Sequence, residues 1–220
     1  MDKRIGVIGL GVMGGAFARH LAGAGWEVMG YDIDADRNRE ARAAGVEIAH
    51  SAEEVAESAP DVITSLPTSR AVIDAATVIA RAAAPTRTVV EASTLSLDDK
   101  LEIERILREA GHTALDCPMS GTGAQAAVKD LVVYASGDPT AIERLRPAFD
   151  AFTRKVWDLG DYGNGSKMKF IANHLVAIHN AAAEAMVLAM KAGLDADRVV
   201  EVIGSGAGTS RLCQPGYGRS

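Results

Sequence analysis

Two lysines stand at the start of a long apolar segment, where a lysine is unusual. Lys167 and Lys169 lie in "GNGSKMKFIANH", residues 163–174. The positive end of a helix dipole and burial both disfavour an ammonium group, so a lysine in the first turn of a buried helix is expected to have a lowered pKa. Such a lysine can exchange a proton near neutral pH, as general acid/base catalysis requires.

Helical geometry separates the two lysines. At about 100° per residue, three polar residues fall within roughly 60° of one another in a stripe that includes Lys169: Asn173, Asn180 and Glu184. Lys167 lies about 160° from this stripe and is expected to face solvent or the preceding loop. The rest of the helix is mostly apolar, which predicts burial on most sides. The stripe is therefore either a solvated face or the lining of a polar cleft.

A polar turn at "DCPMSGTG", residues 116–123, supplies another group that could bind substrate. The Ser120 hydroxyl and the N–H groups near Gly121 and Gly123 suit a carboxylate or a carbonyl oxygen. The alternative is an ordinary Pro/Gly loop. Thr94 follows a predicted strand, so it is expected at the crevice where the carboxyl ends of the strands meet.

A glycine-rich segment predicts a binding site for a dinucleotide. It follows a predicted strand, opens a predicted helix and reads Gly9-Leu10-Gly11-Val12-Met13-Gly14. Gly9 allows a tight turn, Gly11 lets the backbone approach a pyrophosphate, and Gly14 lets the helix pack on the strand. The free N–H groups at the start of the helix then receive the anion.

Asp32 bears on the choice between the two nicotinamide cofactors, NAD and NADP. At the end of the second predicted strand, its carboxylate is placed to bind ribose hydroxyls and to repel a 2′-phosphate, which favours NAD over NADP. Arg37 could contact a 2′-phosphate, and Asp32 could be a turn residue only, so NADP stays open. Two other classes of dinucleotide-binding enzyme are not favoured. Short-chain dehydrogenases need Tyr-x-x-x-Lys, but the residue four positions after Tyr162 is Ser166. FAD-binding proteins share the glycine loop, but no other segment resembles a flavin site.

The elements that must position these groups alternate between strand and helix. Strands are predicted over residues 4–10, 26–32, 46–49, 61–66, 88–93, 113–117, 131–136 and 155–159. Helices are predicted over residues 12–25, 35–45, 69–84, 96–110 and about 139–152, with a brief helix after Ser51. Alternation with short connections predicts an α/β fold, a Rossmann-type doubly wound parallel sheet with helices on both faces.

The composition bounds the function classes. The 220 residues carry a net charge of -6, which argues against nucleic acid as the main partner. The longest weakly charged stretch, residues 170–190, holds too many polar groups to face lipid, so no membrane span and a cytoplasmic location are expected. Cys117 and Cys213 lack metal-ligand spacing and are expected to be reduced thiols, and no metal site is predicted.

Taken together, the motifs resemble those of the β-hydroxyacid dehydrogenases, the group that contains 3-hydroxyisobutyrate dehydrogenase and tartronate semialdehyde reductase and has a 6-phosphogluconate dehydrogenase-like cofactor domain. The resemblance rests on "GLGVMG" near the start, "SLP" at 65–67, "ST" at 93–94, "DCPMSGTGA" at 116–124 and "GNGSKMKFIAN" at 163–173. It implies an NAD(P)-binding Rossmann domain over 1–162, then an interdomain helix and the start of an all-α domain over 163–220.

The resemblance also implies roles for individual residues. Lys169 corresponds to the family's catalytic lysine, because it stands four residues before Asn173. Hydride would pass between nicotinamide and the hydroxyl-bearing carbon of a small β-hydroxyacid or its semialdehyde, with Lys169 as general acid/base. Ser120 and Asn173 would be catalytic residues together with Lys169. Ser120 and Gly121 would bind the substrate carboxylate, Asn173 would orient the substrate, and Thr122, where the family often has glycine, would also bind substrate. Leu66, Pro67 and Thr94 would contact the cofactor, and a homo-oligomer through the helical region is expected.

Two alternatives follow from the same comparison. Imine reductases share the fold, but the presence of Lys169 argues against that activity. Members of the family continue past the length of this chain, so a truncated dinucleotide-binding protein without turnover is the other alternative.

Overall fold

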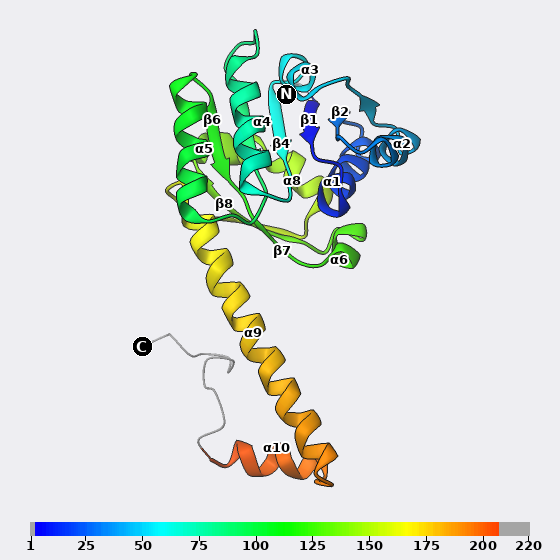
Figure 1. Ribbon diagram of the computed structural model, residues 1–220, viewed down its shortest axis with the longest axis vertical. Helices are drawn as coiled ribbons and strands as arrows, with labels where there is room; N and C mark the ends of the chain where they lie inside the picture. Colours follow the sequence, from blue (N-terminus) through cyan, green and yellow to red (C-terminus); the bar gives the residue numbers. More distant parts are fainter. Residues whose placement is uncertain (1–2, 207–220) are drawn as a thin grey trace. The chain divides into compact units, whose positions relative to one another are not determined.

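The computed structural model describes residues 3–206, which form two compact units that divide between Ile171 and Ala172. The first unit holds every strand found in the described residues (Figure 1). The second unit contains the rest of helix α9 (Asn164–Lys191) and helix α10 (Ala196–Gly204). Beyond the sheet, the described residues lie in one helix after another, as predicted.

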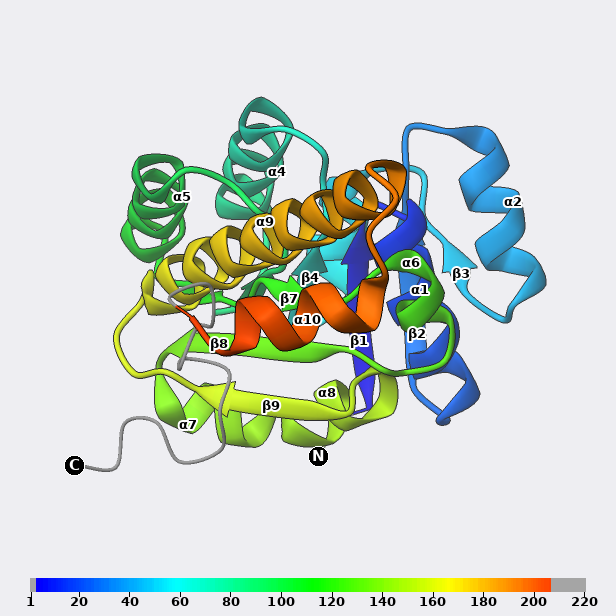
Figure 2. The same cartoon turned by 90° about the horizontal axis from the view of Figure 1, so that it is seen from below.

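The strands of the first unit form one sheet, and most of them are short and buried. They are β1 (Arg4–Ile8), β2 (Glu27–Tyr31), β3 (Glu47–Ile48), β4 (Asp61–Thr64), β5 (Thr88–Glu91), β6 (Thr113–Asp116), β7 (Met119–Ser120), β8 (Val132–Gly137) and β9 (Lys155–Asp158). Across the described residues their order is β3-β2-β1-β4-β5-β6-β8-β7, and β9 lies beside β8 (Figure 2). The pairs from β3 to β6 are all parallel, as predicted.

The wholly parallel sheet that the alternation predicts needs one correction. Strand β8 runs antiparallel to both β6 and β7. Parallel neighbours need a long crossover, usually a helix, and the segment between β6 and β8 contains only β7 and a short helix. The chain therefore reverses direction there, and β9 resumes parallel pairing with β8 after two further helices.

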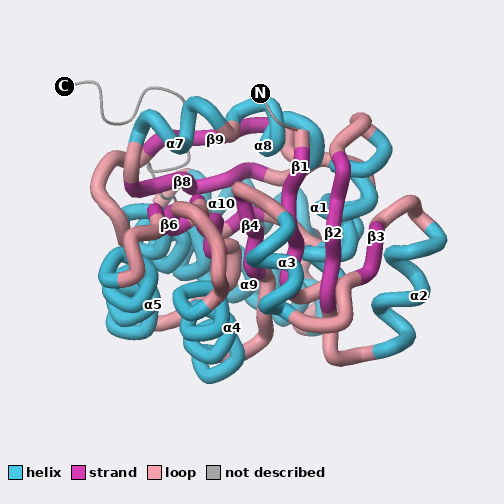
Figure 3. The backbone as a smooth tube through the Cα atoms, turned by 90° about the horizontal axis from the view of Figure 1, so that it is seen from above, coloured by secondary structure: helices cyan, strands magenta, loops and turns pink. Residues whose placement is uncertain are grey.

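Helices cover both faces of the sheet. They are α1 (Val12–Gly23), α2 (Ala35–Ala43), α3 (Ala52–Ser58), α4 (Ser69–Arg81), α5 (Leu97–Glu109), α6 (Gly123–Ala127), α7 (Pro139–Arg144) and α8 (Arg146–Phe152). Figure 3 shows α4 and α5 on one side of the strands and α7 and α8 on the other. Each side has its own apolar core, with the rings of Phe17 and Phe152 packed 4.7 Å apart in one and Ile79 and Ile103 buried in the other.

Two sequence-based expectations about helices were wrong. The single helix expected over about 139–152 is two helices that meet at Leu145. Pro147 explains the break, because proline lacks an N–H group and is tolerated only in the first turn of a helix. Helix α9 was expected to be buried on most sides, yet several of its large apolar side chains, among them Leu175, Val176 and Ile178, are exposed in this single chain.

Two remaining expectations concern cysteines and membranes. Cys117 is a buried free thiol whose pKa is raised chiefly by burial, while Cys213 lies outside the described residues. Among the helices that the structure describes, none has the length and apolar character needed to cross a membrane.

Candidate active site

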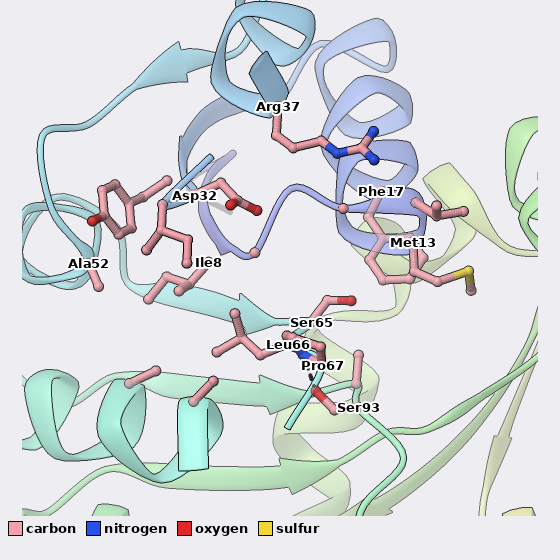
Figure 4. A pocket seen from close by; sticks show the side chains of 18 of the residues that line it. Ile8, Met13, Phe17, Asp32, Arg37, Ala52, Ser65, Leu66, Pro67 and Ser93 are labelled. Carbon is pink, nitrogen blue, oxygen red and sulfur yellow. Dashed lines mark hydrogen bonds between the residues drawn. The ribbon is translucent and has the colours of Figure 1, made fainter. Parts of the chain in front are cut away.

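A cavity of about 930 Å³ opens at the carboxyl ends of β1, β2, β4 and β5 (Figure 4). This is the edge where an open α/β sheet binds its ligands, and the volume suits a large organic cofactor. Ten residues that the sequence motifs brought to attention line the cavity: Gly9, Gly11, Val12, Met13, Asp32, Arg37, Leu66, Pro67, Thr94 and Gly121. Lys169 lines it as well.

The glycine loop between β1 and α1 has the geometry that a pyrophosphate site needs. Gly9 has a φ of 92°, and a side chain there would collide with the Ser65 carbonyl oxygen. A side chain at Gly14 would collide with the Gly9 carbonyl oxygen, so α1 packs directly on the loop. At Gly11 a Cβ atom would meet nothing within 4 Å, which leaves the backbone open toward the cavity. Leu10 and Gly14 are buried behind this surface.

The start of α1 has unused capacity to bind an anion. Its N-cap is Gly11, with no side-chain capping hydrogen bond and no acidic residue in the first turn. By contrast, the side chains of Asp34, Ser51 and Thr68 cap α2, α3 and α4. The first N–H groups of a helix need a partner, and the dipole favours a negative one. The residues present therefore fit a dinucleotide pyrophosphate at this helix.

Asp32 lies directly after β2 and is held in place by the neighbouring backbone. Its carboxylate accepts hydrogen bonds from the Leu10 N–H at 2.7 Å and the Asp34 N–H at 2.9 Å. Each carboxylate oxygen has a further lone pair, so Asp32 can still accept from ribose hydroxyls. Arg37 also lines the cavity (Figure 4). Its guanidinium lies 3.3 Å from the Glu40 carboxylate.

The loops after β4 and β5 form the opposite wall. The Leu66 N–H donates to the Ser93 hydroxyl at 3.0 Å, which ties the "SLP" loop to the "ST" loop. Ser93 in turn donates its N–H to the Glu91 carboxylate at 2.8 Å. Thr94 is exposed and lines the cavity. Ser93 is thus a supporting residue of the site whose role the sequence analysis missed, although it stands in the quoted "ST" pair.

Lys169 reaches the cavity from the second turn of α9. Its side chain is half-buried, and this burial lowers the pKa of its ammonium group. The shift has the direction that the sequence predicts. Lys167 is exposed, as expected, and donates to the side chain of Asn164, the first residue of α9, at 3.0 Å. The cavity therefore contains one of the two lysines and not the other.

The polar turn after β6 contributes to the cavity only in part. Met119 and Gly121 line it, whereas the half-buried Ser120 between them does not. Thr122 also lies outside the lining and instead caps α6 in a capping box with Gln125. Its hydroxyl accepts from the Gln125 N–H at 3.3 Å, and its own N–H donates to the Gln125 side chain at 3.0 Å. The signal for this cap, Thr-x-x-Gln, is present in the sequence.

Asn173 belongs to the second unit, and its substrate-orienting role stays a prediction. Some apolar residues that line the cavity were also missed, among them Ala71, Val78 and Ile33. Ile33 is 93% exposed, which is unusual for a large apolar side chain. Its place directly after Asp32 is the signal that could have identified it.

Comparison with known proteins identifies the family. Residues 4–160 match the model of the NAD-binding domain of 6-phosphogluconate dehydrogenase. Residues 163–219 match the model of the NAD-binding domain of NADP-dependent 3-hydroxyisobutyrate dehydrogenase. A probable 3-hydroxyisobutyrate dehydrogenase of Mycobacterium tuberculosis strain H37Rv is 35% identical over 93% of this chain and 70% of its own length.

Two further proteins agree with this assignment. An NAD-dependent L-serine dehydrogenase of Pseudomonas aeruginosa is 35% identical over 94% of this chain and 70% of its own length. The solved structure of Mycobacterium tuberculosis 3-hydroxyisobutyrate dehydrogenase with L-serine has a TM-score of 0.88 and 34% identity, covering 97% of this chain and 74% of that one. Solved imine reductases are 15% to 24% identical, a level at which only the fold is shared.

The family models account for both parts of the chain, and the relatives are dehydrogenases that match it almost throughout. The cavity has the glycine loop and the uncapped helix that such cofactor domains use. The chain belongs to the β-hydroxyacid dehydrogenase family, which includes 3-hydroxyisobutyrate dehydrogenase, and is an NAD(P)-dependent oxidoreductase acting on CH–OH groups.

Proposed function

We propose that Lys169 is the general acid/base in a hydride transfer between NAD(P) and a small β-hydroxyacid or its semialdehyde. The observation that carries this proposal is that Lys169 lines the same cavity as the glycine loop. Burial lowers the pKa of this lysine, so a larger fraction of it is neutral at a given pH than for an exposed lysine. A neutral amine is the form that can accept a proton from a hydroxyl group.

In the proposed reaction, different residues of the chain have different roles. When bound, NAD(P) would supply the hydride chemistry. The amino group of Lys169 takes the hydroxyl proton in oxidation, and the ammonium form returns a proton to the carbonyl oxygen in reduction. The N–H groups at the start of α1 would hold the pyrophosphate, and Leu66, Pro67 and Thr94 line the other side of the cavity.

For the substrate, we propose a small carboxylate with a neighbouring hydroxyl group. The names of the relatives support this class, because 3-hydroxyisobutyrate and L-serine are both such compounds. Ser120 and Gly121 would bind the carboxylate and Asn173 would orient it. Because both the hydroxyl and the N–H group of Thr122 are engaged with Gln125, we propose that Thr122 contributes to substrate binding by shaping this turn.

We further propose NAD as the preferred cofactor, because the Asp32 carboxylate lines the cavity and would repel a 2′-phosphate. For the domains we propose a boundary between residues 162 and 163. The first family-model match ends at residue 160 and the second begins at residue 163, which supports that boundary. The compact units divide later, after Ile171.

We also propose a homo-oligomer that covers the apolar side chains of α9. Leu175, Val176 and Ile178 are between 40% and 56% exposed in the single chain, and contiguous apolar surface of this kind marks an interface. Sedimentation equilibrium would show a mass above 23.0 kDa for the 220-residue chain. A monomer at micromolar concentration would contradict this proposal.

One assay tests the proposed reaction. The 220-residue chain would be mixed with NAD or NADP and a panel of small β-hydroxyacids, and the absorbance of the reduced cofactor followed. We expect turnover with at least one compound that carries both carboxylate and hydroxyl. Calorimetry with NAD alone is the control for binding. Cofactor binding without turnover on the whole panel would instead support a dinucleotide-binding protein.

A further inference from the structure

Three charged side chains are fully buried beneath the start of α9. Lys100 of α5 forms ion pairs with Glu91, at the end of β5, and with Asp116, at the end of β6. The side chains of all three are at most 1% exposed. Removing three charges from water is costly, and a well-packed apolar cluster of the same volume is often as stable. The cluster therefore calls for an explanation other than stability.

Asp116 connects this cluster to the first turn of α9. One of its carboxylate oxygens accepts the Ser166 N–H at 2.7 Å, and the other accepts the Ser166 hydroxyl at 2.9 Å. The second oxygen also lies 2.9 Å from the Lys100 ammonium group. Ser136 of β8 completes the connection by accepting the Gly165 N–H at 2.9 Å. The first N–H groups of a helix lack partners within it, so two strands of the sheet supply the cap for α9.

This cap fixes the orientation of the residue that follows it by one turn. Lys169 stands three residues after Ser166, so at about 100° per residue the two side chains point within about 60° of each other. Ser166 is 1% exposed and faces the sheet, while Lys169 is half-buried and lines the cavity. A helix start that is held at two adjacent N–H groups can neither rotate nor fray without breaking buried hydrogen bonds.

We propose that Lys100 is a positioning residue for the reaction: by holding Asp116 against the start of α9, it keeps Lys169 directed into the cavity. The proposal rests on the proposed role of Lys169. Burial by itself would lower the pKa of Lys100, but the two carboxylates outweigh it and the pKa is raised, so Lys100 is charged at neutral pH. The pKa of Glu91 is also raised, but there burial is the cause, and the charge of Lys100 opposes it.

The first test replaces Lys100 without changing the length of its side chain greatly. In Lys100→Met, the Asp116 carboxylate loses its ammonium partner and is expected to move toward water, which weakens its hydrogen bonds to Ser166. We expect kcat to fall on the order of ten- to a hundredfold, because a misplacement of about 1 Å can have an effect of that size. The KM for the cofactor is expected to change much less than kcat, since the glycine loop lies between β1 and α1 and the Glu91 carboxylate still accepts the Ser93 N–H in this variant.

A second measurement does not depend on turnover. Competitive labelling with trace acetic anhydride, read by mass spectrometry over a pH series, reports the pKa of Lys169. Since burial is what lowers this pKa, loosening α9 is expected to raise it in Lys100→Met. Lys167→Ala is the matched control, because Lys167 is exposed in the same turn, and it should leave the pKa of Lys169 unchanged.

A double variant separates positioning from charge balance. Lys100→Met with Glu91→Gln restores the net charge of the buried cluster but not the contact to Asp116. We expect the melting temperature to recover while kcat stays low and the pKa of Lys169 stays raised. Recovery of both kcat and the pKa of Lys169 would show that Lys100 only balances charge, and it would overturn the proposal.

Ser166→Ala tests the far end of the connection while all three charges remain. It should lower kcat and raise the pKa of Lys169 in the same direction as Lys100→Met. An unchanged kcat and an unchanged pKa of Lys169 in this variant would also overturn the proposal. If the wild-type chain lacks turnover but the labelling result holds, the proposed reaction fails and the positioning of Lys169 stands.

Discussion

Lys169 combines the two properties that a general base needs, access to the cavity and a lowered pKa. Lys167, two residues earlier, has neither a place in the cavity nor a buried side chain. The difference between them follows from helical geometry, because two residues turn a helix by about 200°. At the residue scale, a pair of lysines that look equivalent in the sequence therefore have separate positions and separate expected effects.

The lowered pKa of Lys169 sets the direction of the pH dependence. In oxidation the neutral amine is the active form, so kcat/KM should rise with pH and level off above the pKa of Lys169. Because burial lowers that pKa, the rise should occur below the range of an exposed lysine. In reduction the ammonium form is active, so the dependence should be reversed. Initial rates in both directions over a pH series would check this, and the same sign in both directions would contradict it.

Asp32 is expected to control the choice of cofactor. Asp32→Asn removes the charge that repels a 2′-phosphate and weakens a charged hydrogen bond, which typically contributes about 1.5–3 kcal/mol. The ratio of kcat/KM for NADP to that for NAD should rise on the order of tenfold or more. Arg37→Ala is the companion variant and should lower the same ratio. A ratio that does not change in Asp32→Asn would show that Asp32 acts only on the loop through Leu10 and Asp34.

Some residues of the site could be predicted from their types and others could not. The glycine loop, Asp32 and Lys169 carry local signals, and the structure places them around one cavity. Lys100 carries a weaker signal that was missed. It stands three and seven residues before Ile103 and Leu107 and is buried with them on one face of α5, a spacing at which apolar residues are expected. The carboxylates that it pairs with come from other strands, which no local pattern reveals.

At the scale of elements, the start of α1 is the feature that most directly suits a cofactor. It has no capping side chain, whereas α2, α3 and α4 have theirs. Helix α9 solves the same problem with groups from the sheet, because Asp116 and Ser136 accept its first N–H groups. One helix start is thus left for a ligand and the other is fixed in place.

Two glycine variants distinguish binding from folding at α1. Gly11→Ala meets open space, so it should lower the free energy of unfolding by only about 0.5–1 kcal/mol through a poorer N-cap. The added methyl group points to where the pyrophosphate should approach, so the Kd for NAD should rise on the order of tenfold or more. Gly14→Ala collides with backbone instead and should lower the free energy of unfolding by about 1–3 kcal/mol or more. Calorimetry and thermal unfolding would check both, and tight NAD binding by Gly11→Ala would contradict the assignment.

The elements themselves could be predicted where their periodicity was long. The parallel strands from β3 to β6 and the helices between them follow the predicted ranges closely. The short β7 and α6 were not predicted, because both fall in the polar turn after β6, where proline and glycine indicate a loop. The capping box of Thr122 and Gln125 was the available signal for α6.

At the scale of the whole molecule, sheet topology brings the site together. The carboxyl ends of β1, β2, β4 and β5 meet at one edge, and residues as far apart as Gly9 and Lys169 line one cavity there. The exposure of the apolar residues on α9 could not be predicted, because an apolar pattern indicates that a surface is covered without saying by what.

The most direct test of the central claim compares Lys169→Ala with Lys167→Ala in the same assay. Removing a general acid/base typically lowers the rate by about 10²- to 10⁴-fold, so kcat for Lys169→Ala should fall by that factor while its Kd for NAD stays close to that of the wild type. Lys167→Ala should keep both values, because its side chain is exposed and lies outside the cavity. Full turnover by Lys169→Ala, or its loss in Lys167→Ala alone, would contradict the account.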